Sequence, residues 1–146
     1  MLDGVFKLEP VAKLVIAGFS FPAFSGDGES RNLRTHMCLP NQGPIPVGTY
    51  YVIDRQTVWY RIDKNEKSNW FALYAKDKVV DDERYCDGVM RGQFRLHPKG
   101  RRGVSRGCIT LELASDFALL RRILGATETQ LIPGTEWMSY GTVVVA

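Results

Sequence analysis

His97 and Cys108 are the two residues whose types and spacing could carry out covalent chemistry. An imidazole can accept the proton of a thiol, and the resulting thiolate is a strong nucleophile. Gly107 stands directly before Cys108. A glycine there leaves the approach to the sulfur open, so that backbone N–H groups could meet the oxyanion of a tetrahedral intermediate. The pair therefore predicts a nucleophilic cysteine with a histidine base.

Strand alternation places this pair on one face of a sheet. If Leu96 points into the core, His97 points the other way, because successive side chains of a strand alternate between faces. If Ile109 points into the core, Cys108 and Thr110 share the opposite face. The alternative is that Cys108 is a small buried apolar residue and His97 an ordinary strand-end histidine. The alternation and the glycine before the cysteine favour the functional interpretation.

The rest of the sequence must supply the elements that position the pair. Short stretches rich in β-branched and aromatic residues predict strands. The segment 21–47 is predicted to be turns and loop that form part of a site or cover it. The predicted strands are Val5–Leu8, Ala12–Ala17, Thr49–Asp54, Thr57–Arg61, Trp70–Lys76, Gln93–His97, Cys108–Leu111 and Thr142–Val145.

One helix is expected near the C-terminus, with Ser115 or Asp116 as its N-terminal cap and Gly125 as its C-terminal cap. Its apolar residues recur at helical spacing, so it should pack against the sheet. The fold class is thus mainly β with one principal helix, in a single domain over residues 1–146. The apolar residues in question are Phe117, Leu120, Ile123 and Leu124.

Composition agrees with a packed globular domain. Of the 146 residues, 45% are hydrophobic and 24% charged, which excludes a disordered or membrane-embedded chain. The longest apolar run near the start is too short for a bilayer span, so we expect no signal peptide and no membrane insertion.

Positive charge is concentrated in one segment. Residues 91–106 carry six basic side chains and no acid, whereas the remaining 13 basic and 16 acidic residues give −3. Such a focus could attract an anionic ligand, lower the pKa of a nearby thiol, or bind nucleic acid. The six are Arg91, Arg95, Lys99, Arg101, Arg102 and Arg106.

Three cysteines leave at least one thiol unpaired within the chain. A Cys38–Cys86 disulfide would leave Cys108 free, but spacing alone leaves that pairing open. His36 beside Cys38 lacks a second ligand pair, so zinc is not expected. The acidic stretch 77–87 is expected to be a solvated turn, and Trp70 a core or sheet-face aromatic. We predict neither a metal nor a cofactor.

Three segments in order resemble the L,D-transpeptidase family. Ser105-Arg106-Gly107-Cys108-Ile109, preceded by His97, is similar to the family signature of a histidine followed by Ser-x-Gly-Cys. Gly43 to Tyr50 is similar to the upstream turn and strand of that family. Phe21 to Gly26 resembles a segment of the short L,D-transpeptidase effectors of type VI secretion. The resemblance runs from about residue 21 to 124 and implies a mostly β, sandwich-like or barrel domain.

The resemblance implies catalytic roles for three residues, and the place of Ser105 in the same turn suggests a role for it as well. Cys108 would be the nucleophile and His97 its base, with Gly107 and Cys108 supplying oxyanion N–H groups. Ser105 would hydrogen-bond within the turn or contact substrate.

One position departs from the family pattern. Larger relatives usually carry an arginine where this chain has Thr110. We therefore expect the substrate-binding residues among Arg106, Arg95 and Thr110, while Arg101 and Arg102 are expected to be solvated charges.

The implied function is cysteine-dependent trimming or exchange on the peptide stems of peptidoglycan, by an antibacterial effector. Implied partners are the stem peptides, a cognate immunity protein and a delivery component of the secretion system. The protein would be made in the cytoplasm and delivered to a target cell's periplasm. No nucleic-acid partner is expected.

Two alternatives stay open. One is a small nucleic-acid-binding domain that uses the basic segment, and the other is a different cysteine peptidase or amidase of the cell wall. In many papain-like wall amidases the cysteine precedes the histidine, whereas here His97 precedes Cys108.

Overall fold

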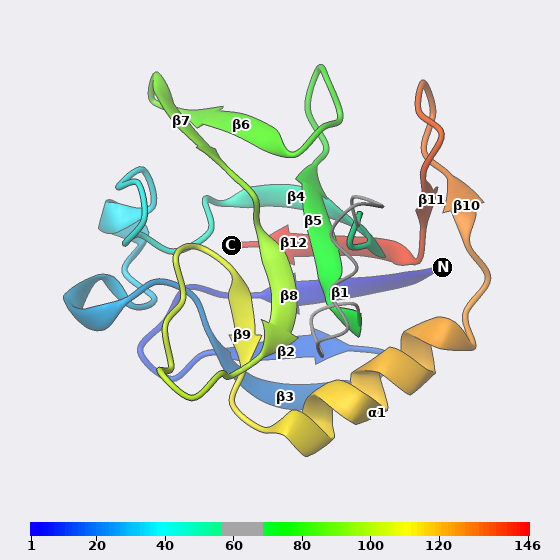
Figure 1. Ribbon diagram of the computed structural model, residues 1–146, viewed down its shortest axis with the longest axis horizontal. Helices are drawn as coiled ribbons and strands as arrows, with labels where there is room; N and C mark the ends of the chain where they lie inside the picture. The colour runs from blue at the N-terminus through cyan, green and yellow to red at the C-terminus, as the bar shows by residue number, and fades with distance from the viewer. Residues whose placement is uncertain (57–68) are drawn as a thin grey trace.

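Stretches in which buried and exposed residues alternate form the sheet of this protein. The computed structural model describes residues 1–56 and 69–146 (Figure 1). In β1 (Leu2–Phe6) and β2 (Lys13–Ile16) every second side chain is buried, as expected for strands with one face on a core. The predicted strand Thr57–Arg61 lies outside the described residues.

Eight strands close into a barrel in the order β1, β12, β4, β5, β8, β9, β3, β2. The β1–β12 and β8–β9 pairs are parallel and the other pairs antiparallel. Closure leaves the barrel sheet without an open edge. The prediction of a mainly β fold is confirmed. The remaining strands of the barrel are β3 (Phe19–Phe24), β4 (Gly48–Asp54), β5 (Phe71–Ala75), β8 (Arg95–Pro98), β9 (Ile109–Leu111) and β12 (Gly141–Val145).

The helix α1 (Ala114–Gly125) follows β9 and is the only α-helix in the described residues. It crosses one end of the barrel (Figure 1) and buries Phe117, Leu120 and Leu124 in the barrel core. The predicted apolar stripe is confirmed.

Both predicted helix caps were wrong. The helix begins at Ala114, after Leu113 in the N-cap position, and no side chain caps it. Asp116 lies inside the first turn, where its charge complements the helix dipole instead. Gly125 is the last helical residue, followed by Ala126 as C-cap.

Strand β3 is the main element that the prediction of a loop over 21–47 missed. Ala17 and Gly18, with φ of 54° and 80°, form a two-residue turn that folds β3 back on β2, as such turns do in hairpins. The rest of the segment fits the prediction better, since its only regular elements are the short 3-10 helices η1 (Gly28–Ser30) and η2 (Arg34–His36).

A hairpin of β6 (Glu83–Cys86) and β7 (Val89–Gly92) projects from the barrel, at the top of Figure 1. Its turn is Asp87-Gly88, with φ of 47° and 78°. The prediction of a solvated turn over 77–87 was therefore wrong for residues 83–86. A further two-stranded sheet joins β10 (Gln130–Leu131) and β11 (Met138–Ser139).

Candidate active site

The parallel β8–β9 ladder positions the histidine and the cysteine. Leu96 pairs with Ile109 and both are fully buried, which fixes the core side of the two strands. His97 pairs with Thr110 on the other face. Cys108 comes two residues before Thr110, so strand alternation predicts the same face for it, about 6.6 Å back toward the N-terminal end of β9. The register bears out the predicted neighbourhood of His97 and Thr110, and Cys108 directly precedes β9 (Ile109–Leu111).

Hydrogen bonding sets which nitrogen of His97 can act as a base. Nδ1 lies 2.7 Å from the Pro98 carbonyl oxygen. A carbonyl only accepts, so in the neutral ring Nδ1 carries the proton and Nε2 carries the lone pair. Nε2 lies 3.5 Å from Thr110 Oγ1, on the face that it shares with Cys108. His97 is thus oriented with its basic nitrogen toward the ladder.

Trp70 was not predicted to belong to the site. Its ring stacks on the His97 imidazole with 4.2 Å between the centroids and 17° between the planes. The stack restricts rotation of the imidazole about its side-chain bonds. No motif marks this tryptophan, and only its position directly before β5, next to β8 in the barrel, brings it to the histidine.

The turn before Cys108 requires glycine at position 107. Gly107 has a φ of 117°, which L side chains rarely adopt. A Cβ atom there would lie 2.5 Å from Nη2 of Arg91 and 3.0 Å from the Phe94 ring. Gly107 is therefore needed for its backbone conformation and for close packing.

Ser105 is a buried link within this turn. Its hydroxyl donates to the Cys108 carbonyl at 2.8 Å and accepts from the Gly26 N–H at 3.2 Å. The side chain is 1% exposed. Ser105 thus joins the cysteine turn to the segment 25–47, which also contacts the turn through Arg31 and the Gly103 carbonyl.

Arg91 is buried and holds the other side of the turn. Its guanidinium donates to the carbonyl oxygens of Gly43 and Arg106 at 3.1 and 3.3 Å. It also donates to those of Met37 and Pro44. Burying a cation is costly unless its donors are satisfied, and four backbone carbonyls perform that role here. One side chain thereby joins β7, the segment 25–47 and the cysteine turn.

A disulfide closes the same region. Cys38 of the segment 25–47 is bonded to Cys86 of β6, with 5.3 Å between their Cα atoms. Cys108 is the one free cysteine. The pairing that the sequence left open is thus present, and it leaves the candidate nucleophile as a thiol.

Burial dominates the ionisation of Cys108. It raises the pKa of the thiol above its usual value, although the nearby Arg95 and Arg91 act in the opposite direction. The expectation that the arginines would lower this pKa was wrong in its net direction, because desolvation of the thiolate outweighs them. The raised pKa favours the neutral thiol, so attack by Cys108 calls for a base.

The basic segment is not a continuous surface. Arg91 is 4% exposed, Arg95 forms an ion pair with Asp82, and Lys99 lies 3.5 Å from Glu112. The exposed side chains that remain are Arg101, Arg102 and Arg106. Half of the predicted nucleic-acid patch is thus buried or neutralised, which weakens that alternative.

Of the substrate-binding candidates, Arg106 alone is exposed. Thr110 is fully buried, and the Arg95 guanidinium is occupied by Asp82.

Residues 1–56 and 69–146 contain no group of three or more His, Cys, Asp or Glu side chains arranged to hold a metal ion. His36 bonds to Ser30 through Nδ1 at 3.0 Å, and its neighbour Cys38 is in the disulfide. Within the same residues, no helix is long and apolar enough to cross a bilayer.

Fold and site together define a mainly β domain with a free thiol and an oriented histidine on neighbouring parallel strands. The family model of the Tlde1 domain matches residues 20–135, so the chain belongs to the Tlde1 domain family, the L,D-transpeptidase effectors of type VI secretion. The predicted resemblance is confirmed.

A curated relative matches a shorter part of the chain. Xyloglucan O-acetyltransferase 3 of Populus trichocarpa is 32% identical over 77 residues, which are 51% of this chain and 19% of that protein. This chain thus spans less than a fifth of the length of that relative. No solved structure matches.

Proposed function

We propose that this protein is a cysteine-dependent enzyme that acts on the tetrapeptide stems of bacterial peptidoglycan. Membership of the Tlde1 domain family supports the substrate class. The single observation that supports the chemistry is the β8–β9 ladder, in which His97 pairs with Thr110, two residues after the free thiol of Cys108, while Nδ1 of His97 bonds to the Pro98 carbonyl and leaves the lone pair on Nε2.

The proposed reaction begins with a neutral thiol. Nε2 of His97 takes the proton of Cys108 as the sulfur attacks the carbonyl carbon of the third stem residue. A carbon–sulfur bond forms and a tetrahedral intermediate results. His97 then gives the proton to the leaving amine, the bond to the terminal D-alanine breaks, and a thioester remains on Cys108. Water as acceptor gives trimming, and a free D-amino acid gives exchange.

The peptide plane between Arg106 and Gly107 supplies the first oxyanion donor in this proposal. Its carbonyl accepts a hydrogen bond from Arg91. In a trans peptide the N–H points away from the C=O, so the Gly107 N–H points away from Arg91. An N–H held in this way needs no reorganisation when the oxyanion forms. The Cys108 N–H is the second proposed donor.

Substrate binding is assigned to Arg106. Its side chain is exposed next to the nucleophile turn, where a guanidinium can bind the terminal carboxylate of the stem. In this proposal Thr110 contributes by its contact with Nε2 of His97 and not by binding the substrate.

Delivery by a type VI system to a target cell's periplasm, with an immunity protein protecting the producer, is the proposed setting. The Cys38–Cys86 disulfide supports it, because disulfides persist in oxidising compartments such as the periplasm.

Mass spectrometry of purified tetrapeptide muropeptides tests the proposal, with wild type and Cys108→Ala compared in the presence and absence of D-methionine. Loss of D-alanine with wild type alone is expected, and incorporation of D-methionine would identify exchange. Unchanged tetra- and pentapeptide stems with folded wild type would refute the assignment.

A further inference from the structure

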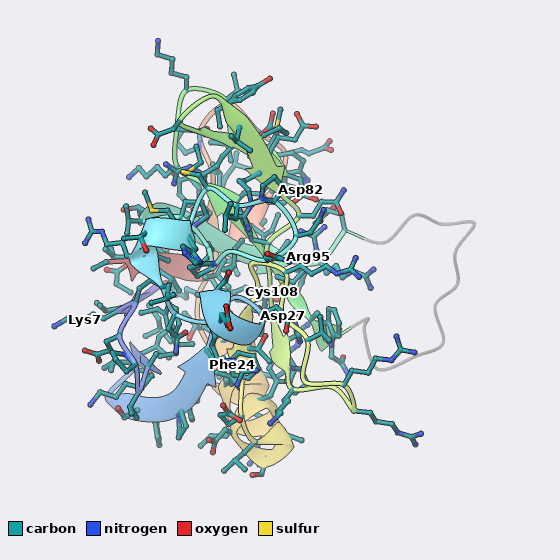
Figure 2. All side chains as sticks on the ribbon, turned by 90° about the vertical axis from the view of Figure 1, so that its left-hand side faces the viewer. Lys7, Phe24, Asp27, Asp82, Arg95 and Cys108 are labelled. Carbon is teal, nitrogen blue, oxygen red and sulfur yellow. A yellow bond between two sulfur atoms is a disulfide. The ribbon has the colours of Figure 1, made fainter. Side chains whose placement is uncertain are left out.

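Arg95 and Asp82 lie beside the nucleophile and take no part in the chemistry described above. The register that pairs Leu96 with Ile109 brings Arg95 level with Cys108. The backbone and the charge of Arg95 lower the pKa of the Cys108 thiol, while the charge of Asp82 raises it. In Figure 2 the labelled side chains of Asp82, Arg95 and Cys108 follow one another from top to bottom near the middle of the view.

The pair is bidentate and partly shielded from solvent. Nη1 and Nη2 of Arg95 each lie 2.7 Å from a carboxylate oxygen of Asp82. The two side chains are 17% and 29% exposed. A further hydrogen bond joins Nη1 to the Phe94 carbonyl at 3.0 Å. The guanidinium is thereby fixed in place, and its paired face is not open to a substrate carboxylate.

We propose that Arg95 and Asp82 are a positioning pair that sets how readily Cys108 loses its proton. The fixed cation favours the thiolate, while the carboxylate holds the cation and counterbalances it. Among the described residues, Arg91 of β7 also acts on the thiol, and the titratable or charged neighbours in the adjoining elements are His97 of β8 and Arg106 of the same turn. This inference rests on the proposed role of Cys108 as nucleophile.

The two members of the pair are expected to have opposite effects on the thiol. Arg95→Gln removes the cation and leaves the carboxylate, so the thiolate becomes less favoured. Asp82→Asn removes the anion and keeps one acceptor oxygen for Arg95, so the thiolate becomes more favoured. An ion pair that served only to hold the fold together would not produce opposite shifts.

The test is the rate of alkylation of Cys108 by iodoacetamide against pH, measured by intact mass without reductant so that Cys108 alone is labelled. At about pH 7.5 we expect Arg95→Gln to react about 3- to 10-fold more slowly than wild type and Asp82→Asn about 3- to 10-fold faster. Arg95→Lys, which keeps the charge, should fall between wild type and Arg95→Gln.

The matched control is Arg121→Gln on α1. It breaks the ion pair of 2.8 Å between Arg121 and Asp54 and should leave the pH profile of alkylation unchanged. Shifts in the same direction, or an Asp82→Asn profile equal to or slower than wild type, would overturn the inference. The assay needs no peptidoglycan. Opposite shifts in a protein without activity on muropeptides would therefore contradict the proposed function and not the role of the pair.

Discussion

The histidine side and the cysteine side of the candidate site are held in place by different means. On the histidine side, His97 sits in a regular ladder, with Thr110 as its register partner and Trp70 stacked on its ring. On the cysteine side, the turn 103–108 is irregular and is held by Ser105, by Arg91 and by the segment 25–47.

The two sides should therefore respond differently to substitution. Ladder hydrogen bonds of the barrel hold the histidine side, so its substitutions should alter chemistry while the fold stays intact. Buried polar contacts between distant segments hold the cysteine side, so its substitutions should lower stability and activity together.

The largest effect is expected from His97→Asn. The asparagine side chain can still donate to the Pro98 carbonyl but lacks the acceptor of Nε2, so kcat should fall about 10²- to 10⁴-fold with little change in unfolding free energy. Steady-state release of D-alanine and urea unfolding measure the two quantities. Thr110→Val is the control on the same side and should cost far less activity. A loss of stability as large as that of cysteine-side variants would remove the distinction between the sides.

Arg91→Met should be the most destabilising change on the cysteine side. Four carbonyl oxygens lose their donor, which predicts a loss of about 3–5 kcal/mol in unfolding free energy. Activity should fall as well, because the Arg106–Gly107 peptide plane loses its support. Arg101→Met, at an exposed arginine of the same segment, should be neutral in urea unfolding. A stable and fully active Arg91→Met variant would show that the turn 103–108 keeps its conformation without Arg91.

Removal of the Cys38–Cys86 disulfide should lower the free energy of unfolding by less than Arg91→Met does. Cys38 and Cys86 are 48 residues apart in sequence, so the paired variant Cys38→Ser/Cys86→Ser should lose about 2–4 kcal/mol. Thermal unfolding with and without reductant tests this, because reductant should destabilise wild type and leave the variant unaffected. Equal midpoints for wild type in both conditions would contradict it.

The smallest effect is a pH dependence at Tyr50, which joins the segment 25–47 to the barrel. Its hydroxyl donates to the Pro46 carbonyl at 2.7 Å and accepts from Arg84 at 3.0 Å. Burial raises the pKa of Tyr50 to about 12, from an ordinary 10.0. The unfolded chain therefore loses this proton first, and stability should fall by about 2 kcal/mol as pH rises from 10 to 12. The decline should be smaller in Tyr50→Phe, and identical declines would exclude Tyr50 as its source.

The period of two along strands made the histidine side predictable. It predicted that His97, Cys108 and Thr110 share one face, and the β8–β9 register pairs His97 with Thr110. Helical spacing likewise identified the buried residues of α1. The predicted N-caps failed because Ser115 and Asp116 favour helix starts only as a tendency, and the helix begins at Ala114 without a side-chain cap.

The cysteine side was mostly beyond sequence reasoning, because its contacts join distant segments. In the sequence Arg91 is one of six basic residues of segment 91–106. The fold buries it among four backbone carbonyls. The sequence predicts a solvated turn around Asp82, whereas in the structure Asp82 pairs with Arg95. One available signal was overlooked, since Asp87-Gly88 between strand-forming residues is typical of a hairpin turn.

The most direct test of the central claim is a single-turnover reaction of enzyme with an equal amount of tetrapeptide muropeptide, quenched in acid and mapped by peptide mass spectrometry. We expect the stem acyl group on the peptide that contains Cys108, with one D-alanine released for each adduct. Release of D-alanine by Cys108→Ala at the wild-type rate would contradict it.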